Sequence, residues 1–366
     1  MRRHVDATIE EILGWVLGFI VLLDIFLLVL YARSNRTIIG SPLSHGLWRL
    51  FVWGSKPLGR WRATFLAFTG PMILVVLLVT WFMLLSLAAA FIIHPNLGTG
   101  IQSNHGATPT DFISALYVGG TSLSLVGASD FIPQDGYFRL FFLLTSLIGL
   151  SLVSLIVSYI MELYNNLQER NTLGLRVHLL SLETGDAAEV IAGLGPHGMF
   201  DAGYQVIAQW AAEIAHGKES HHFYPILFYF RFREPYYSVS RTALISLDTV
   251  TLIKSALDDE EYGWLKEAAA VEQLWRGTLS ELKMLAKTFL PKTDMDAPPD
   301  EQTCMRWKRR YAAGMERIQR AGIKTTKSGA DEYISLRTQW DRYVTLLAPQ
   351  FAYNLDEIDT ALAQVK

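Results

Sequence analysis

Few side chains in this sequence have a spacing that is typical of catalysis or metal binding. Serine, histidine and aspartate occur without a nucleophile elbow or a comparable context, so we expect no enzyme activity. The segment HGKESHH brings together metal-capable side chains, namely His216, Glu219, His221 and His222. Their spacing matches no established zinc geometry. We therefore expect a polar loop there, with neither a metal nor a cofactor.

Two further motifs are suited to anion or nucleotide binding. A cationic run contains Arg306, Lys308, Arg309 and Arg310. It suits anionic lipid or a phosphorylated ligand, although a solvated helix face is the usual explanation.

The glycines of 193–198 read GxGxxG, a dinucleotide fingerprint that needs a strand before it. Because Asp186 and Glu189 form a capping box just upstream, we favour a helix, a Gly/Pro turn and a second helix.

The elements that must position these residues fall into two halves of different composition. Of the 366 residues, 51% are hydrophobic and 18% charged, whereas a soluble domain carries about a quarter charged residues. Residues 1–166 contain 9 Lys or Arg and 8 Asp or Glu, against 23 and 27 in residues 167–366. The first half is therefore typical of a membrane protein and the second of a soluble domain. A net charge of −3 gives no reason to expect nucleic-acid binding, and the single Cys304 excludes an internal disulfide.

Three apolar windows are long enough to cross a bilayer, which requires about 20 helical residues. They are Ile12–Tyr31, Pro71–Ile93 and Leu140–Met161. The first is too long for a signal peptide and no small-residue cleavage site follows it. The third continues without a helix breaker into ELYNNLQERN, which links the membrane half to the soluble half.

The distribution of basic residues predicts the orientation of these spans. Residues 32–70 contain six lysines and arginines, whereas 94–138 contain none. Under the positive-inside rule, the first loop and the C-terminal domain are cytoplasmic and the N-terminus is outside. Within the first loop, residues 47–62 mix tryptophan with cations, which is typical of a segment lying in the inner-leaflet interface. An ordinary tryptophan-anchored lead into the second span is the alternative.

The segment between the second and third spans contains a second kind of apolar helix. Thr110 is a suitable cap, with Asp111 in the first turn. The stretch DFISALYVGGTSL that follows is apolar but too short to cross a bilayer. Non-helical backbone at membrane depth is tolerated only where it is buried in protein or lines a wet cavity. A long helix, a re-entrant half-helix, a loop and a second long helix form the layout of a pore.

The same segment carries a motif. Without a gap, the chain reads Ala115-Leu116-Tyr117 and then Leu125-Val126-Gly127-Ala128-Ser129-Asp130-Phe131-Ile132-Pro133. Over residues 110–165 the sequence resembles the pore module of the tetrameric potassium channel superfamily, especially its two-helix prokaryotic members. Their filter reads T-V-G-Y-G-D-x-x-P. The alternative interpretation is three core-packing helices with an external Gly/Ser loop.

The resemblance implies a potassium-type filter with several substitutions. A filter of this type coordinates K⁺ through rings of carbonyl oxygens and one ring of threonine hydroxyls. Leu125 takes the place of that threonine, and Ala128 replaces the aromatic residue that fixes the filter's diameter. Gly127 keeps the first glycine, whereas Ser129 replaces the second, at a cost of about 1–2 kcal/mol if it adopts φ > 0. We expect K⁺ and Na⁺ to be poorly distinguished.

Further residues of the membrane half have two interpretations each. Asp130 and Asp135 suit acidic rings at the outer mouth, partly neutralised by Arg139, although we favour Asp130 bracing the filter from behind. Gly149 falls on the family's gating-hinge glycine, with close helix packing as the alternative. Asp24 is the only charge inside a predicted span. We favour a hydrogen bond to a neighbouring helix over a gating or proton-sensing role.

The C-terminal half predicts a predominantly α-helical domain. Four stretches favour amphipathic helices beyond the Gly/Pro turn, at 243–257, 259–290, 301–322 and 331–348, and a fifth does so at 354–365. Residues 223–232 are either a strand or the start of a buried helix, and 291–300 form a turn or linker.

Together these observations predict a membrane all-α protein of three parts. Residues 1–69 hold the first span and the interfacial loop, 70–165 the potassium-channel-like pore module, and 166–366 the helical cytoplasmic domain. One pore loop cannot surround an ion, so the resemblance implies a homotetramer in the cell (inner) membrane that conducts monovalent cations. The cytoplasmic domain would gate or assemble it, with an unidentified cytoplasmic ligand as a candidate partner. A non-conducting receptor or assembly scaffold that reuses the channel fold is the alternative.

Overall fold

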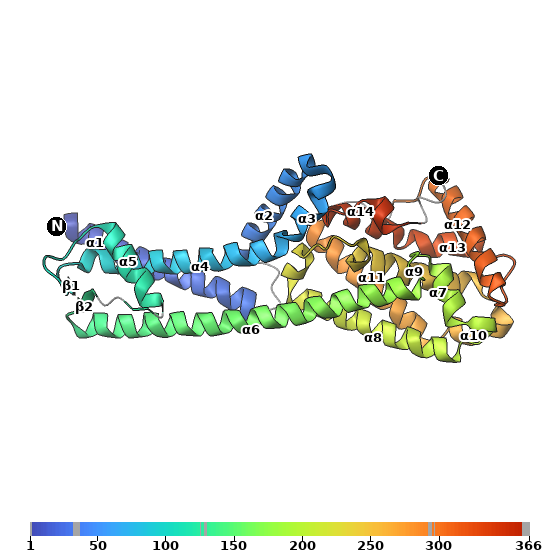
Figure 1. Ribbon diagram of the computed structural model, residues 1–366, viewed down its shortest axis with the longest axis horizontal. Coiled ribbons are helices and arrows are strands. Elements are labelled where there is room, and N and C mark those ends of the chain that lie inside the picture. The colour runs from blue at the N-terminus through green and yellow to red at the C-terminus, as the bar shows by residue number, and fades with distance from the viewer. Residues whose placement is uncertain are drawn as a thin grey trace. The chain divides into compact units, whose positions relative to one another are not determined.

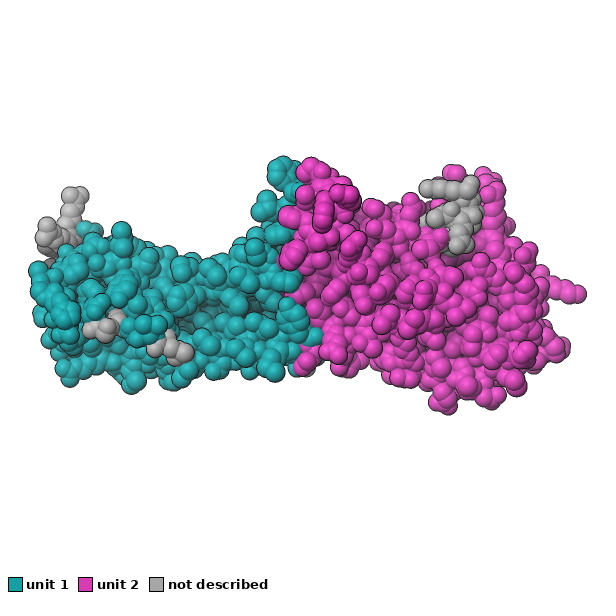
Figure 2. Space-filling model, in the orientation of Figure 1, with its two compact units in different colours: residues 1–54, 69–164, 223–225 teal, residues 55–68, 165–222, 226–366 magenta. Residues whose placement is uncertain are grey.

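The computed structural model describes residues 2–31, 37–124, 126–127, 130–291, 295 and 297–360. The fold is all-α, apart from two three-residue strands (Figure 1). The chain forms two compact units (Figure 2). The first comprises residues 1–54, 69–164 and 223–225, and the second comprises 55–68, 165–222 and 226–366.

Three helical segments of the described chain are long and apolar enough to cross a membrane. They are Val5–Leu30, Thr69–Asn96 and Gly136–Leu180. They correspond to the three windows predicted from composition, so that prediction is confirmed. The first consists of α1 (Arg2–Ile25) and a π-helical turn (Phe26–Leu30), the second of α4 (Thr69–Ile93) and a 3₁₀ turn (His94–Asn96), and the third of α6 (Gly136–Leu180).

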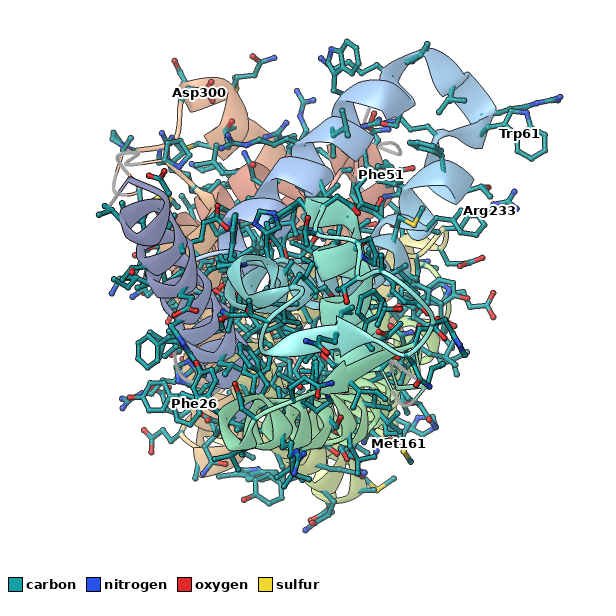
Figure 3. All side chains as sticks on the ribbon, turned by 90° about the vertical axis from the view of Figure 1, so that its left-hand side faces the viewer. Phe26, Phe51, Trp61, Met161, Arg233 and Asp300 are labelled. Carbon is teal, nitrogen blue, oxygen red and sulfur yellow. The ribbon has the colours of Figure 1, made fainter. Side chains whose placement is uncertain are left out.

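Small residues allow α1 and α4 to approach closely. A Cβ added at Gly14 would lie 2.7 Å from the carbonyl oxygen of Ala88, and one at Gly18 would lie 3.7 Å from the Cβ of Ala88. Such contacts stabilise helix pairs in bilayers, where van der Waals packing replaces the hydrophobic effect. Beside this crossing, Val21 and Trp81 are buried in one apolar cluster. The opposite faces of the long helices carry exposed apolar side chains, as Phe26 and Met161 illustrate (Figure 3).

Short helices follow the first long segment. They are α2 (Gly40–Ser55), a 3₁₀ turn (Lys56–Trp61) and α3 (Arg62–Ala67). Trp53 and Trp61 are both more than half exposed, and Trp61 projects outward in Figure 3. The guanidinium carbon of Arg60 lies 5.6 Å from the Trp61 ring centroid, within range of a cation–π contact. The membrane-interface location of residues 47–62 stays a prediction, as does the tryptophan-anchored lead into the second span.

The second unit is built from helices. They are α7 (Ala187–Leu194), α8 (Asp201–Phe223), α9 (Val239–Ala256), α10 (Asp259–Lys266), α11 (Ala269–Phe289), α12 (Glu301–Arg320), α13 (Ala330–Thr338), α14 (Asp341–Gln350) and α15 (Leu355–Ile358). Three 3₁₀ turns lie among them, at Pro196–Gly198, Pro225–Tyr229 and Pro235–Tyr237. Residues 223–232 therefore contain a buried 3₁₀ turn, so the strand interpretation was wrong and the buried helical one holds only for Pro225–Tyr229. The last predicted helix ends at Ile358, and residues 361–366 lie outside the described residues.

Helix α9 corrects one prediction. We expected an amphipathic helix at 243–257, but every residue of α9 except Val239 and Lys254 is buried. Some of its hydroxyls bond to the preceding turn: Ser246 donates to the carbonyl of Thr242 at 2.7 Å, and Thr251 donates to that of Leu247 at 2.6 Å. A serine or threonine that bonds to the preceding turn needs no water. Polar residues in this part of the sequence therefore do not indicate an exposed helix face.

Two charged residues of α9 are also buried, Arg241 and Asp248. The Asp248 Oδ1 atom accepts hydrogen bonds from the Tyr333 hydroxyl at 2.7 Å and from Arg337 Nη1 at 2.9 Å. The Asp248 Oδ2 atom accepts one from Arg310 Nε at 2.9 Å. Arg310 also donates to Asp359 Oδ1 at 2.6 Å. This Asp248 network joins α9, α12, α13 and the end of α15.

Candidate functional site

The predicted half-helix is present as α5 (Phe112–Leu123), an apolar helix of 12 residues between α4 and α6. The cap is Asp111 and not Thr110 as we expected. Asp111 has extended backbone angles, and its side chain accepts from the Ser114 N–H at 3.0 Å and the Ser114 hydroxyl at 2.8 Å. The bond from the Ser114 hydroxyl lowers the pKa of the Asp111 carboxyl most, and the bond from the Ser114 N–H lowers it further. The Asp111 carboxylate accepts both bonds from Ser114. Thr110 lies one residue before the position from which a side chain caps this helix.

Helix α5 packs on α4 through small residues. A Cβ added at Gly119 would lie 2.9 Å from the Ser86 carbonyl oxygen and 3.0 Å from the Ala89 Cβ. On the same face, Ala115 and Val118 are fully buried. The opposite face exposes Ile113 and other apolar atoms. The half-helix is thus fixed on one side and open on the other.

The C-terminal end of α5 contacts α6. The Ser146 hydroxyl donates to the Ser122 carbonyl at 3.0 Å, and a Cβ added at Gly149 would overlap the carbonyl oxygen of Leu123. Gly149 therefore has the close-packing role that we gave as the alternative, and α6 continues as a helix through it. The hinge role stays a prediction.

Replacing Gly149 by alanine should therefore destabilise the contact between α5 and α6. Relief of the overlap requires α5 to move, and overpacking of this kind costs about 1–3 kcal/mol. A thermal melt of the purified chain should show a lower midpoint for Gly149→Ala. The control is Gly136→Ala on the same helix, where an added Cβ has no atom within 4 Å. Unchanged melting with altered channel opening would instead support the hinge.

Two residues of the predicted filter are described, Val126 and Gly127. The Val126 N–H donates to the Ser124 hydroxyl at 3.3 Å, and the Val126 side chain is 85% exposed. Gly127 has φ +73°, the left-handed region that glycine adopts without strain, and an added Cβ would meet nothing within 4 Å. Three residues of the predicted filter lie outside the described residues, namely Leu125, Ala128 and Ser129.

The loop is closed behind Asp130. The Tyr117 hydroxyl of α5 donates to Asp130 Oδ2 at 3.3 Å. The carbonyl of Asp130 accepts from the Asn104 N–H at 2.8 Å, at the start of a ribbon between β1 (Ile101–Ser103) and β2 (Phe131–Pro133). Asp130 therefore ties the end of the loop to the helix that precedes it, which agrees with the bracing role that we favoured; that role stays a prediction.

Tyr117→Phe should loosen this loop while leaving α5 folded. A hydrogen bond contributes about 1 kcal/mol, equivalent to about a fivefold change in an opening equilibrium. Hydrogen exchange of the amides at 124–131 should accelerate by about that factor. Tyr137→Phe, which removes a hydroxyl from a half-exposed ring on α6, should leave these amides unchanged. Equal exchange in both variants would contradict the brace.

The other predicted outer-mouth residues lie at the start of α6. The Asp135 Oδ1 atom accepts from the Phe138 N–H at 2.8 Å, which makes Asp135 the cap of this helix. Arg139 lies in the first turn and is exposed, as is Asp135. Their effect on an ion stays a prediction.

Asp24 is fully buried among three hydrogen-bond donors. Its Oδ1 accepts from the Ile39 N–H at 2.7 Å, and its Oδ2 accepts from the Gly40 N–H at 3.2 Å and the Trp81 indole at 2.9 Å. Ile39 and Gly40 begin α2, where free N–H groups favour an anion. The bond to Trp81 on α4 agrees with the role that we favoured. No pattern in the sequence indicated that the start of α2 would supply the other two donors.

The motifs of the second unit are in helical surroundings. His216, Glu219, His221 and His222 lie on α8, so the expected polar loop was wrong. Within the described residues, no three His, Cys, Asp or Glu side chains are close enough to bind a metal. The glycines of 193–198 end α7 and form the 3₁₀ turn before α8. Asp186 caps α7 as predicted by accepting from the Ala188 N–H, but Glu189 pairs with Arg317, and the expected capping box is not seen among the described residues. In the cationic run, Arg310 belongs to the buried Asp248 network, whereas Arg306, Lys308 and Arg309 are exposed.

Comparison of the chain with protein-family models, curated proteins and solved structures found no match. The resemblance of residues 110–165 to a potassium-channel pore therefore stays a prediction. It rests on the quoted residues and on the geometry of α5 and the loop that follows it.

Proposed function

We propose that the chain is the subunit of a homotetrameric, potassium-channel-like cation channel that distinguishes K⁺ from Na⁺ weakly. It would lie in the inner membrane of the cell, with its N-terminus outside and its second unit in the cytoplasm. The second unit would gate or assemble the pore through α6, a single helix whose residues belong to both units.

One observation carries most of this proposal: a short helix and an irregular loop are attached to each other between two long apolar helices. The hydrogen bond from Tyr117 to Asp130 closes the loop over residues 118–129, and the loop contains a glycine at φ +73°. In extended backbone successive carbonyls point to opposite sides, and positive φ at alternate residues turns them to the same side, as a carbonyl-lined ion site requires. Irregular backbone between membrane helices needs burial or water, which a pore between four copies supplies.

The weak selectivity is inferred from the substitutions at Leu125, Ala128 and Ser129. They remove a hydroxyl ring, an aromatic support and a second flexible glycine. Fewer well-formed oxygen rings should coordinate K⁺ less completely.

The test is a reversal-potential measurement on the reconstituted chain under a K⁺/Na⁺ bi-ionic gradient. We expect a tetramer whose current reverses near zero. The triple variant Leu125→Thr, Ala128→Tyr and Ser129→Gly should shift the reversal toward the K⁺ potential. Absence of a tetramer would contradict the proposal. A silent tetramer that stays silent in the triple variant would favour the non-conducting scaffold.

A pair of glycine variants shows whether any current passes through this loop. Gly127→Ala places a side chain at φ +73°, which costs about 1–2 kcal/mol in the left-handed region, and it should reduce the current strongly. Gly106→Ala is the matched control because Gly106 has φ +79° and equally open surroundings outside the loop. Equal currents in the two variants would place the ion path elsewhere.

A further inference from the structure

A small cavity of about 20 Å³ lies inside the second unit, at the start of α9. Arg170 of α6 and Arg231 line it, as do Ser238 and Val239 at the start of α9, and aromatic rings form most of the remaining wall. A volume of about 10–15 Å³ is enough for one water molecule. This cavity therefore accommodates one small species and is too small for an organic ligand.

Two guanidinium groups at this cavity lack a carboxylate partner. Arg170 donates to the carbonyls of Leu227 and Phe230, at 2.7 and 2.8 Å. Arg231 is 5% exposed, and its Nε donates to the carbonyl of Ala352 at 3.2 Å. In the part of the chain that the structure describes, the ion pairs of arginine involve other arginines. Nor does any described aspartate or glutamate line the cavity.

Burial disfavours the positive charge of both groups. Burial lowers the pKa of Arg170 to about 10, and Tyr353 and Glu281 compensate only in part. Burial lowers the pKa of Arg231 as well. Arginine is nevertheless not deprotonated in proteins. Because a buried charge is costly without an opposite charge nearby, the two guanidinium groups favour an anion in the cavity.

The start of α9 adds further hydrogen-bond donors. The first N–H groups of a helix have no partner within it and favour an anion, and the Ser238 side chain does not cap α9. Ser238 is 3% exposed. Its hydroxyl and the Arg170 Nε are buried without a hydrogen-bond partner among the described residues. Donors from a helix, a hydroxyl and a guanidinium group favour an anion over a water molecule, which must also donate.

We propose that this cavity binds one small monatomic anion, such as chloride. The ion balances the charge of Arg170 and Arg231 and accepts a hydrogen bond from the Ser238 hydroxyl. The site lies within the second unit, so it does not depend on the proposed channel function.

The experiment measures the thermal midpoint of the full chain in detergent while sodium chloride replaces sodium gluconate at constant ionic strength. An ion that binds only the folded chain raises the midpoint, so a saturable rise with chloride is expected. Gluconate is too large for the cavity and sets the baseline. Crystals of the chain soaked in bromide should show an anomalous scattering peak in the cavity, which a water molecule does not give.

Two serines at the start of α9 form a matched pair of variants. Ser238 and Ser240 are both buried, and neither hydroxyl has a partner among the described residues, but only Ser238 lines the cavity. A hydrogen bond to a charged group corresponds to about tenfold in affinity. Ser238→Ala should therefore require about ten times more chloride for the same rise, whereas Ser240→Ala should respond as the parent chain does.

A second pair of variants tests the charge, with far-UV circular dichroism to show that the helices remain. Arg231→Gln should abolish the response to chloride, and Arg231→Lys, which keeps the positive charge, should retain part of it. A parent midpoint that does not change with chloride, equal responses of the two serine variants, or a bromide-soaked cavity without an anomalous peak would overturn the proposal. Because none of these measurements uses an ion current, their outcome is independent of the reversal-potential experiment.

Discussion

Asp248→Asn should lower the free energy of unfolding of the second unit by about 3–5 kcal/mol, the cost of removing one partner from a buried ion pair. After the substitution Arg310 keeps the carboxylate of Asp359 and Arg337 keeps that of Asp341, but three buried donors lose the charged acceptor that Asp248 provides. Burial by itself would lower the pKa of Arg310, but the carboxylates of Asp248 and Asp359 raise it well above its ordinary value. Burial would also lower the pKa of Arg337, but Tyr333 and Asp248 outweigh it and raise that pKa. Arginine is not deprotonated in proteins, so both guanidinium groups stay charged after the substitution.

This loss should appear as a fall of about 10 °C in the thermal midpoint of the second unit, given its size. The control is Asp331→Asn, the same chemical change on α13. Asp331 is almost fully exposed and lies 3.7 Å from Lys308, so it should change stability by less than about 1 kcal/mol. If both variants have the same thermal midpoint, the buried network does not stabilise the fold.

Asp24→Asn should destabilise the first unit by about 3 kcal/mol. The carboxylate accepts from Ile39, Gly40 and Trp81, and bonds to a charged acceptor are worth about 1.5–3 kcal/mol each. The amide keeps one acceptor oxygen but turns an NH₂ group toward at least one donor. The start of α2 should then detach from α1 and α4.

Two measurements check this prediction. The thermal midpoint of the chain in detergent should fall, and the amides of α2 should exchange faster than those of α4. Asp6→Asn is the control, since Asp6 is an exposed carboxylate on the same helix. Faster exchange in both variants would show that the charge of α1, and not the buried contact of Asp24, is responsible. Unchanged exchange in Asp24→Asn would falsify the anchoring role.

The sequence by itself determined the features that depend on neighbouring residues. Three long apolar windows predicted three helices able to cross a membrane, because span length and composition are local properties. Thr110 and Asp111 before a short apolar run predicted α5, although the cap is Asp111 and not Thr110. The cap at Asp186 and the glycines that follow predicted the turn between α7 and α8, because caps and turns are formed by adjacent residues.

Only the tertiary structure decided which polar residues are buried and what they contact. The donors to Asp24 are 15, 16 and 57 residues away, and the partners of Asp248 are 62, 85 and 89 residues away. Helix α9 has polar residues that suggest an exposed face, yet helices from the whole second unit cover it. The sequence around His221 likewise suggested a polar loop, whereas in the structure His221 is buried against Glu281 and Phe228. Periodicity along one helix reports polarity, whereas burial depends on which distant elements pack against it.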